Sequence, residues 1–374
     1  MKKRIMFVMP ALFLGGAETQ FRNIISSFSK KNYDITVLTL DPLDEESEFI
    51  KENSNVKFKY SGISLNYYKN KYKGKKIRKS LVYLSLYLRL IKQIRALSKE
   101  KKYDVIIGYH MFWSILIPIF KMMGSKVIYS ERTAQKNLLE RSYLSYFYNK
   151  ADIITCNSIY TKELLTQINV NDVKVIYNGV NFTNAEEDAV VPEELKKISL
   201  IARISPDKNQ MLVVDAFKNI EDKELYLIGK IDNKEYYNQL IKKIDEYNLK
   251  DKVHFVEYTE NIKVVYKMAD LIILPSLEEG MANVILESFL YKKYCIASNI
   301  PNNKFLLQDG RGEVFAIDKP EEVLDAIKKY EDMSSDKKRS TLDSNYRYLV
   351  ENFQMSRMTG EYIELVEKLI KEKR

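Results

Sequence analysis

The chain has 374 residues, 45% of them hydrophobic and 30% charged, and a formal net charge of +9 at pH 7. This length predicts two domains, and the composition is that of a globular protein without an apolar run of the roughly 20 residues that would cross a bilayer. The two cysteines, Cys156 and Cys295, exclude a disulfide framework and a thiolate metal site, so we expect a reducing, cytoplasmic environment.

The opening segment, MKKRIMFVMPALFLGGAETQFRNI, fits two different structures. Its basic start, its apolar run at 5–14 and its small residues at 15–17 imitate a secretory signal peptide. Alternatively, residues 4–9 form a buried strand, 12–16 a glycine loop and 18–28 a helix whose N-terminus receives an anion. We favour the second interpretation, because Pro10 interrupts the apolar run where a strand would end.

The pattern then alternates short β-rich runs with longer helical runs, which is typical of parallel α/β domains. In the first half we expect strands at 4–9, 33–38, 56–60, 105–108, 126–130, 153–156 and 173–177. Helices are expected between most of these strands, at 18–28, 77–97, 111–123, 138–149 and 158–168.

A polar, acidic segment without periodicity, residues 181–192, is the expected linker. Beyond it we expect strands at 197–202, 225–228, 253–256, 271–274, 294–297 and 313–316, and helices at 208–217, 234–247, 262–268, 284–291, 320–330, 335–352 and 356–373. The sequence therefore predicts two doubly wound domains, 1–182 and 183–352, and a C-terminal helix within 353–374 that packs back towards the first domain. The carboxyl ends of two such sheets would face a common cleft.

Two glutamates stand out in LIILPSLEEGMANVILESFLYKKYCIAS, residues 271–298. Glu279 lies in the turn after a predicted strand, and Glu287 follows eight residues later, one turn into a predicted helix. Because Gly280 frees the loop, both carboxylates can face one crevice and accept hydrogen bonds from sugar hydroxyls. The alternative is that Glu279 caps the turn and Glu287 is a solvated helix residue.

Groups suited to phosphate lie between the two glutamates and also earlier in the chain. The helix is expected to begin near Asn283, a favoured N-cap residue, so that backbone amides around Ala282 and Val284 can bind phosphate oxygens. In SLIARISPDKNQ, Arg203 follows a strand and Lys208 begins a helix, which would bracket a diphosphate. Alternatively, Arg203 satisfies strand-end carbonyls and Lys208 is a surface residue.

These residues carry a resemblance to a known family. The chain resembles the GT-B glycosyltransferases of the retaining family 4 group in four motifs that occur in the same order: GGAE at 15–18, NGV at 178–180, R-x4-K at Arg203 and Lys208, and E-x7-E at Glu279 and Glu287. The resemblance implies an α/β fold of two Rossmann-like domains.

The resemblance also implies a role for each motif. It assigns Gly15 and Gly16 to the approach of the donor diphosphate, Arg203 and Lys208 to its neutralisation, Glu279 to the donor sugar and Glu287 to the nucleotide ribose. Catalysis would then rest on electrostatic stabilisation of the departing diphosphate. No Asp-x-Asp triplet occurs in the sequence, so we expect neither a metal nor another cofactor.

The chain departs from the family pattern at two places. Family members commonly carry EGFG after the first glutamate, where this chain has EGMA. Many members place a histidine near the acceptor where this chain has SERT, so Glu131 and Arg132 either orient the acceptor or donor sugar or form a strand-end ion pair. His110 follows another strand end and either touches substrate or caps the strand.

Basic residues are concentrated between Lys69 and Lys102, where thirteen Lys and Arg face one acid, Glu100. The predicted helix here repeats apolar residues at Ile77, Leu81, Leu84, Leu88 and Ile91, a face widened by Leu86, Leu90, Ile94 and Leu97. We expect that face to pack on the first sheet. The basic stretch from Lys69 to Lys79 is either a solvated loop or a contact for the inner membrane, an anionic polysaccharide precursor or, least of all, nucleic acid.

The resemblance thus implies a cytoplasmic, membrane-associated hexosyltransferase. It would move a sugar from a nucleotide-diphosphate donor, expected to be a UDP-sugar, to a glycan or lipid-linked acceptor in surface polysaccharide biosynthesis, without specific nucleic-acid binding. The alternative is a secreted two-domain solute-binding protein, which would make the opening segment a cleaved signal peptide.

Overall fold

The computed structural model describes residues 2–12, 15–42, 47–61, 76–100, 102–109, 111–132, 137–182, 191–257 and 261–372. The chain divides into two compact units. Unit 1 comprises Met1–Gly179 and Met355–Arg374, and unit 2 comprises Val180–Gln354. These boundaries lie within three residues of the expected domain limits at 182 and 352.

Unit 1 is built on a parallel sheet of seven strands in the order β3-β2-β1-β4-β5-β6-β7. The strands are β1 (Lys3–Met9), β2 (Tyr33–Thr39), β3 (Lys57–Tyr60), β4 (Val105–Tyr109), β5 (Lys126–Glu131), β6 (Ile153–Cys156) and β7 (Val173–Val175). Side chains of β1 alternate between two cores, Met6 and Val8 in one and Ile5 and Phe7 in the other. Because both faces of the sheet are covered, the strand is apolar and buried from Ile5 to Met9.

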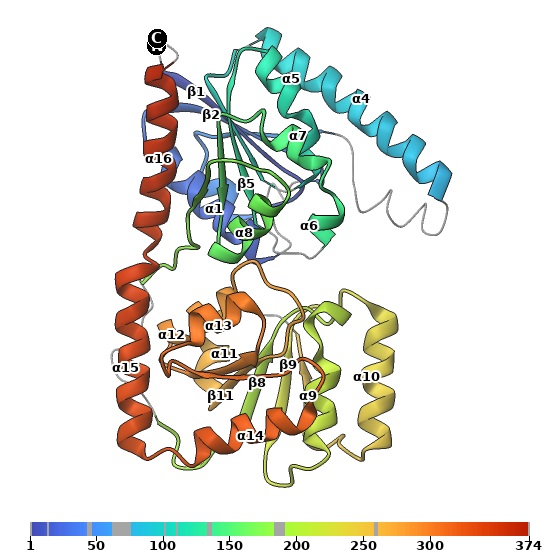
Figure 1. Cartoon of the computed structure of the whole chain (residues 1–374), viewed down its shortest axis with the longest axis vertical. Coiled ribbons are helices and arrows are strands. Elements are labelled where there is room, and N and C mark those ends of the chain that lie inside the picture. Colours follow the sequence, from blue (N-terminus) through green and yellow to red (C-terminus); the bar gives the residue numbers. More distant parts are fainter. Residues whose placement is uncertain are drawn as a thin grey trace. The chain divides into compact units, whose positions relative to one another are not determined.

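Helices cover both faces of the unit 1 sheet (Figure 1). One core takes side chains from α4 (Lys76–Glu100), the 3-10 helix η1 (Met111–Leu116), α5 (Ile117–Met122), α6 (Asn137–Glu140), α7 (Leu144–Tyr148) and α8 (Ile159–Gln167). The opposite core takes them from α1 (Gly16–Ser29) and from the last helix, α16 (Met355–Glu372). The C-terminal helix therefore belongs to unit 1.

Unit 2 repeats this design with a parallel sheet of six strands in the order β10-β9-β8-β11-β12-β13. The strands are β8 (Lys197–Ile201), β9 (Glu224–Ile228), β10 (Val253–Val256), β11 (Leu271–Leu274), β12 (Tyr294–Ser298) and β13 (Glu313–Phe315). The helices are the 3-10 helix η2 (Pro206–Lys208), α9 (Gln210–Phe217), α10 (Lys234–Glu246), α11 (Ile262–Met268), α12 (Asn283–Leu290), α13 (Pro301–Leu307), α14 (Pro320–Glu331) and α15 (Ser335–Asn352).

Most elements match their expected positions, but several helices do not. The helices expected at 111–123 and 138–149 are each divided in two, into η1 and α5 and into α6 and α7. Two short helices, α2 (Glu48–Glu52) and α13, were absent from the sequence prediction. Helices of five to seven residues carry little periodicity, so pattern alone finds some of them, such as α11, and misses others.

Helix α4 packs on a different face from the expected one. Leu90 and Ile94 are fully buried, whereas Leu84 and Leu88 are 57% and 59% exposed. The expectation that Leu84 and Leu88 belong to the core is therefore wrong: at 100° per residue they lie on a different side of the helix from Leu90 and Ile94. Within the described ranges, neither this helix nor any other is long and apolar enough to span a membrane.

Candidate active site

In unit 2 the parallel sheet brings the predicted donor residues to one edge. Loops at the carboxyl ends of β8 and β11 carry Arg203 and Glu279, and both loops lead into helices. The loops are also joined directly, because the amide of Leu277 donates to the carbonyl of Asp207 over 2.9 Å. In doubly wound domains this edge of the sheet is where ligands bind.

Lys208 and Glu279 form an ion pair at this edge. Lys208 Nζ lies 2.7 Å from Glu279 Oε1, and the two side chains are only 15% and 16% exposed. Lys208 ends the 3-10 turn η2 rather than beginning the helix, since the left-handed residue Asn209 (φ 52°) separates it from α9. The turn lifts the lysine out of the helix and directs it towards the loop after β11.

Arg203 is more exposed than Lys208 and is held by two aspartates. Its Nη1 lies 2.7 Å from Asp232 Oδ2, and its Nη2 lies 3.7 Å from Asp207 Oδ2. Lys208 Nζ lies 3.9 Å from the same Asp207 oxygen. The two cations predicted to bracket a diphosphate thus meet at a shared carboxylate, and each is matched by acids.

Glu287 occupies a more apolar place, on α12. Its Oε2 accepts a hydrogen bond of 2.9 Å from the hydroxyl of Tyr266, on α11. Burial raises the pKa of Glu287 to about 7, although the Tyr266 hydrogen bond acts in the opposite direction. Tyr266 stacks on Tyr291 with 4.9 Å between ring centroids, which fixes the donor of this hydrogen bond.

The start of α12 differs by one residue from the expectation. The helix begins at Asn283, and its N-cap is Ala282, which makes no side-chain capping hydrogen bond. Asn283 is therefore the first helical residue and not the cap, which corrects the prediction. The carbonyl of Ala282 accepts from the amides of Ile285 and Leu286, so Val284 lies within the first turn.

The glycine loop lies in unit 1, after β1. Gly15 is the N-cap of α1, and its carbonyl accepts from the amide and the hydroxyl of Thr19 over 3.0 and 3.2 Å. A Cβ added to Gly15 would lie 3.2 Å from Glu18 Oε2. Gly16 is the first helical residue. Both glycines thus occupy the N-terminus of a helix at the carboxyl end of a central strand.

Arg132 is buried in unit 1 at the end of β5, with an exposure of 7%. Its guanidinium donates to the hydroxyls of Tyr362 (2.7 Å) and Tyr109 (3.0 Å), to Ser130 Oγ (3.0 Å) and to Asn178 Oδ1 (2.8 Å). These contacts join β5 to the C-terminal helix α16 and to the NGV motif. Interactions with the phenolic oxygens raise the Arg132 pKa above its usual value despite its burial.

Glu131, also fully buried, is bound by a different set of groups. Its Oε2 accepts from the hydroxyls of Tyr148 (3.0 Å) and Tyr129 (3.3 Å), and its Oε1 accepts from the Arg132 amide (3.0 Å). Burial is the largest cause that raises the pKa of Tyr129 and of Tyr148. The nearby Glu131 carboxylate raises the pKa of both tyrosines further. Whether Glu131 and Arg132 orient a substrate stays a prediction, and His110 lies outside the described residues.

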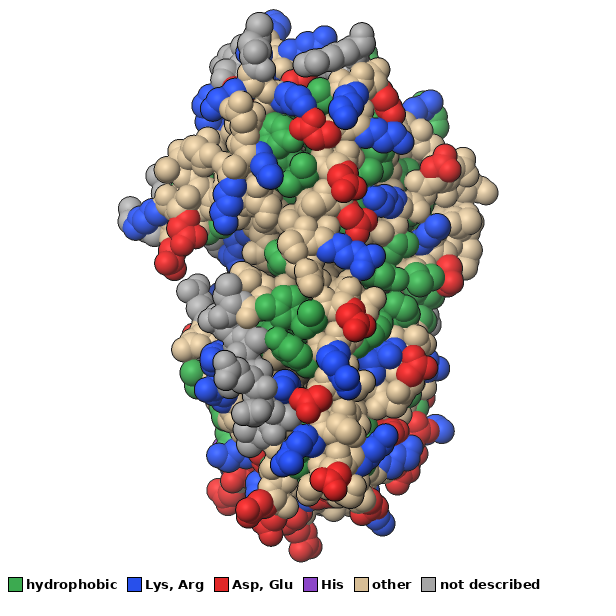
Figure 2. All heavy atoms as spheres, turned by 90° about the vertical axis from the view of Figure 1, so that its left-hand side faces the viewer, with side chains coloured by type: hydrophobic (Ala, Val, Ile, Leu, Met, Phe, Trp, Pro, Cys, Tyr) green, Lys and Arg blue, Asp and Glu red, His purple; other side chains and the backbone are tan. Residues whose placement is uncertain are grey.

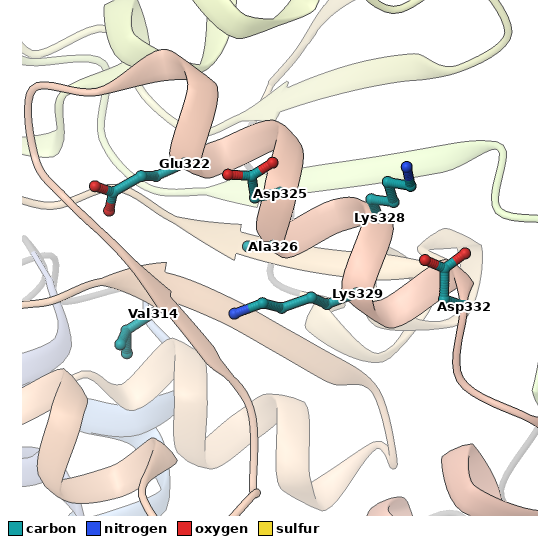
Figure 3. Close-up of a pocket in the computed structure, with 7 residues that line it drawn as sticks. All are labelled: Val314, Glu322, Asp325, Ala326, Lys328, Lys329 and Asp332. Carbon is teal, nitrogen blue, oxygen red and sulfur yellow. The ribbon is translucent and has the colours of Figure 1, made fainter.

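The predicted site residues do not coincide with the hollow in Figure 3. That hollow, of about 340 Å³, lies between α14 and the last strand and is lined by Val314, Glu322, Asp325, Ala326, Lys328, Lys329 and Asp332. Five of these side chains are charged, three of them acidic (Glu322, Asp325 and Asp332) and two basic (Lys328 and Lys329). In the described part of the chain, no cluster of His, Cys, Asp or Glu could hold a metal ion.

Comparison with known protein families covers nearly the whole chain. Residues 14–184 match the model described as Glycosyltransferase Family 4, and residues 181–348 match the model described as Glycosyl transferases group 1. The chain is a GT-B glycosyltransferase of the group 1, family 4 type.

Individual proteins show the same relationship. The chain is 26% identical over 369 residues to an uncharacterized glycosyltransferase of Methanocaldococcus jannaschii, which covers 92% of this chain and 93% of that protein. It is 28% identical over 158 residues to the N-acetylgalactosamine-N,N'-diacetylbacillosaminyl-diphospho-undecaprenol 4-alpha-N-acetylgalactosaminyltransferase of Campylobacter jejuni, covering 41% of this chain and 42% of that protein. The crystal structure of HepE from Anabaena in complex with UDP and glucose has a TM-score of 0.80 at 16% identity, over 98% of this chain and 100% of that chain.

These findings decide between the two expected classes of function. The glycosyltransferase interpretation is confirmed, and the comparisons do not support the alternative of a solute-binding protein. The opening segment, which fitted two structures, contains β1, and β1 lies between β2 and β4 in the sheet. This agrees with the interpretation of residues 4–9 as a buried strand.

Several residues that shape this candidate site escaped the sequence analysis. Asn302, on α13, donates from Nδ2 to the carbonyl of Glu279 over 2.6 Å. Pro301 at the first position of that helix was a usable signal, since proline favours this position. Gly229 follows β9 with φ 155°, and a Cβ there would lie 2.1 Å from the Ala202 carbonyl oxygen. Only glycine therefore allows the chain to pass beside the loop that carries Arg203.

Proposed function

We propose that this glycosyltransferase moves a sugar from a nucleoside-diphosphate donor to a glycan or lipid-linked glycan acceptor, with retention of the anomeric configuration. The bond between C1 of the sugar and the diphosphate oxygen breaks, and C1 bonds to a hydroxyl oxygen of the acceptor, which loses its proton. The diphosphate leaves with additional negative charge, so cations positioned at its oxygens accelerate the reaction.

The observation that carries this proposal is the Lys208–Glu279 ion pair at the carboxyl edge of unit 2. A lysine that is only 15% exposed needs a charge partner, and Glu279 supplies one in the free protein. A diphosphate can replace that partner. The released Glu279 carboxylate then accepts hydrogen bonds from hydroxyls of the donor sugar, so one ion pair serves both halves of the donor.

The remaining donor contacts follow from the geometry around this pair. Arg203, exposed and adjacent to the same Asp207, is suited to bidentate contact with the second phosphate. Glu287 is suited to the ribose hydroxyls, because a carboxylate in an apolar place gains more from each hydrogen bond. The amides at the start of α12 supply further positive potential.

Comparison supports UDP as the nucleotide and a lipid-linked glycan as the acceptor. The related HepE was crystallised with UDP and glucose, and the name of the Campylobacter relative describes a diphospho-undecaprenol acceptor. An acceptor of that kind is membrane-bound. We therefore extend the proposal to a cytoplasmic enzyme at the inner face of the membrane, with the basic stretch Lys69 to Lys79 as a contact; residues 62–75 lie outside the described ranges.

Titration calorimetry with UDP, followed by a transfer assay with UDP-sugars, tests the proposal. Lys208→Ala should weaken UDP binding, and Glu279→Gln should slow transfer more than it weakens UDP binding. Lys329 and Glu313 provide matched controls, since they form an ion pair of 3.1 Å on the last strand and α14 of the same unit. If Lys208→Ala binds UDP as tightly as Lys329→Ala does, the donor site is not where we place it.

A further inference from the structure

The outer face of α4 carries two leucines that the fold does not use. Leu84 and Leu88 are 57% and 59% exposed, while Leu90 and Ile94 fill the core on another side of the same helix. Large aliphatic side chains exposed one turn apart form a continuous apolar strip. In Figure 1, α4 diverges from the rest of unit 1 towards its N-terminal end.

The same face continues into a row of cations. Lys92, Arg95 and Lys99 are exposed, and at 100° per residue they share a sector of about 80° with Leu84 and Leu88. Among the residues that the structure describes, no carboxylate forms an ion pair with any of the three cations. The face shown in Figure 2 carries α15 and α16. On α16, by contrast, Arg357 pairs with Glu361 and Lys368 pairs with Glu372, in each case one turn away.

We propose that this outer face of α4, defined by Leu84, Leu88, Lys92, Arg95 and Lys99, docks the protein on an anionic lipid bilayer. An interfacial helix needs apolar side chains that enter the acyl region and cations that meet lipid phosphates. The two leucines and the three cations supply these groups on one side of one helix. The helix lies in the membrane plane and does not cross it.

Other occupants fit this face less well. A second copy of the chain, related by a twofold axis, would place six cations in one interface without a carboxylate on this face to pair with them. A nucleic acid or another soluble polyanion would pair with the cations but leave the leucines in water. A bilayer with anionic headgroups satisfies both halves of the face at once.

This inference deepens the membrane part of the proposed function, yet its test does not depend on sugar transfer. The surface belongs to unit 1, whereas Lys208 and Glu279 belong to unit 2. Vesicle binding is measured without donor or acceptor, and UDP binding is measured without vesicles. Failure of one measurement therefore leaves the other interpretable.

The test is flotation of the full chain with vesicles of phosphatidylglycerol and phosphatidylcholine in equal parts, compared with phosphatidylcholine alone. We expect binding to the anionic vesicles only. Lys92→Gln/Arg95→Gln/Lys99→Gln should weaken binding about a hundredfold, from about fivefold per charge. Leu84→Ser/Leu88→Ser should weaken it about tenfold and leave a residual binding that high salt abolishes.

Control variants remove the same number of charges, or an apolar side chain of similar exposure, from other parts of the surface. Lys242→Gln/Lys250→Gln/Lys368→Gln removes the same charge from lysines that are 67–80% exposed elsewhere, and Val264→Ser removes a 53% exposed apolar side chain. Both controls should bind vesicles like the wild type. Circular dichroism of every variant establishes that it is folded.

Three results would overturn the proposal. The first is equal vesicle binding by the wild type and either α4 variant. The second is that only the charge variant loses vesicle binding, while Leu84→Ser/Leu88→Ser binds like the wild type and the wild type binds heparin as tightly as vesicles. This result would indicate a general polyanion site. The third is a dimer that Leu84→Ser/Leu88→Ser converts to a monomer in sedimentation, which would assign the face to a second copy of the chain.

Discussion

Replacing Glu287 by glutamine should stabilise unit 2 at neutral and alkaline pH. The Glu287 carboxyl sits in an apolar place on α12, and burial raises its pKa from 4.5 to about 7. A pKa raised by this amount means that ionising the carboxyl in the folded state costs about 3 kcal/mol, at about 1.4 kcal/mol per pKa unit. Glutamine keeps the acceptor for Tyr266 and carries no charge.

The sign of the pH dependence follows from the two pKa values. Below about pH 4.5 the carboxyl is protonated in both the folded and the unfolded state, so wild type and Glu287→Gln differ little. Between pH 4.5 and 7 the folded state binds the proton more tightly, and the wild type loses stability as the pH rises. Above pH 7 the full penalty applies to the wild type and is absent in the variant.

Hydrogen exchange of the amides in β11 and α12 measures this difference within unit 2. Above pH 7 we expect protection in Glu287→Gln to exceed that of the wild type by on the order of a hundredfold, which corresponds to about 3 kcal/mol. Glu221→Gln, an exposed residue of the same unit, is the control. If Glu287→Gln and Glu221→Gln show the same protection at pH 8, the carboxylate is not held at an energetic cost.

The same substitution should weaken UDP binding. Glu287 is proposed to accept hydrogen bonds from the ribose, and the ionised carboxylate accepts them better than an amide does. UDP affinity of the wild type should therefore fall as the pH drops below 7, and that of Glu287→Gln should not. A variant that gains stability while losing nucleotide affinity would show that this carboxylate is retained for binding and not for folding.

Three further substitutions test other parts of the structure. Lys208→Ala should lower the transfer rate by about 10²–10³-fold in steady-state assays, because it removes a cation from the leaving diphosphate. Asn302→Leu should lower kcat about tenfold with little change in UDP affinity. The Asn302 side chain donates to the Glu279 carbonyl and so positions the loop that is proposed to hold the donor sugar. Arg132→Met should destabilise unit 1 by about 3 kcal/mol, because it leaves buried hydroxyls without a hydrogen-bond donor. Urea unfolding followed by tryptophan fluorescence measures this loss, since Trp113, the one tryptophan of the sequence, is buried in unit 1.

The strands were the most predictable part of this fold. Their bounds follow from short apolar runs between turn residues, and parallel sheets covered on both faces demand such runs. The strand at 153–156 and that at 271–274 match the structure residue for residue. A strand buried on both sides leaves little freedom in sequence, so pattern and structure agree.

Helix faces and turns were less predictable, for a physical reason. Which side of α4 is buried depends on where the helix leaves the sheet, and that is a tertiary property. The run of leucines in α4 fits more than one helical face, so the sequence could not distinguish Leu90 from Leu84. Likewise, the 3-10 turn at Lys208 depends on Asn209 adopting a left-handed conformation. Asparagine tolerates this conformation but does not require it, so the residue type alone does not predict the turn.

The cations of the proposed donor site already pair with carboxylates, which a diphosphate would replace. In the free protein Lys208 pairs with Glu279, and Arg203 pairs with Asp232 and Asp207. A partly buried cation without such a partner would be costly, so these carboxylates stabilise the site before a donor arrives. Each phosphate contact must then replace an existing ion pair, which reduces the net gain on binding. In the proposed mechanism, the same exchange would let the diphosphate leave after transfer, because the carboxylates would return to the cations that it vacates.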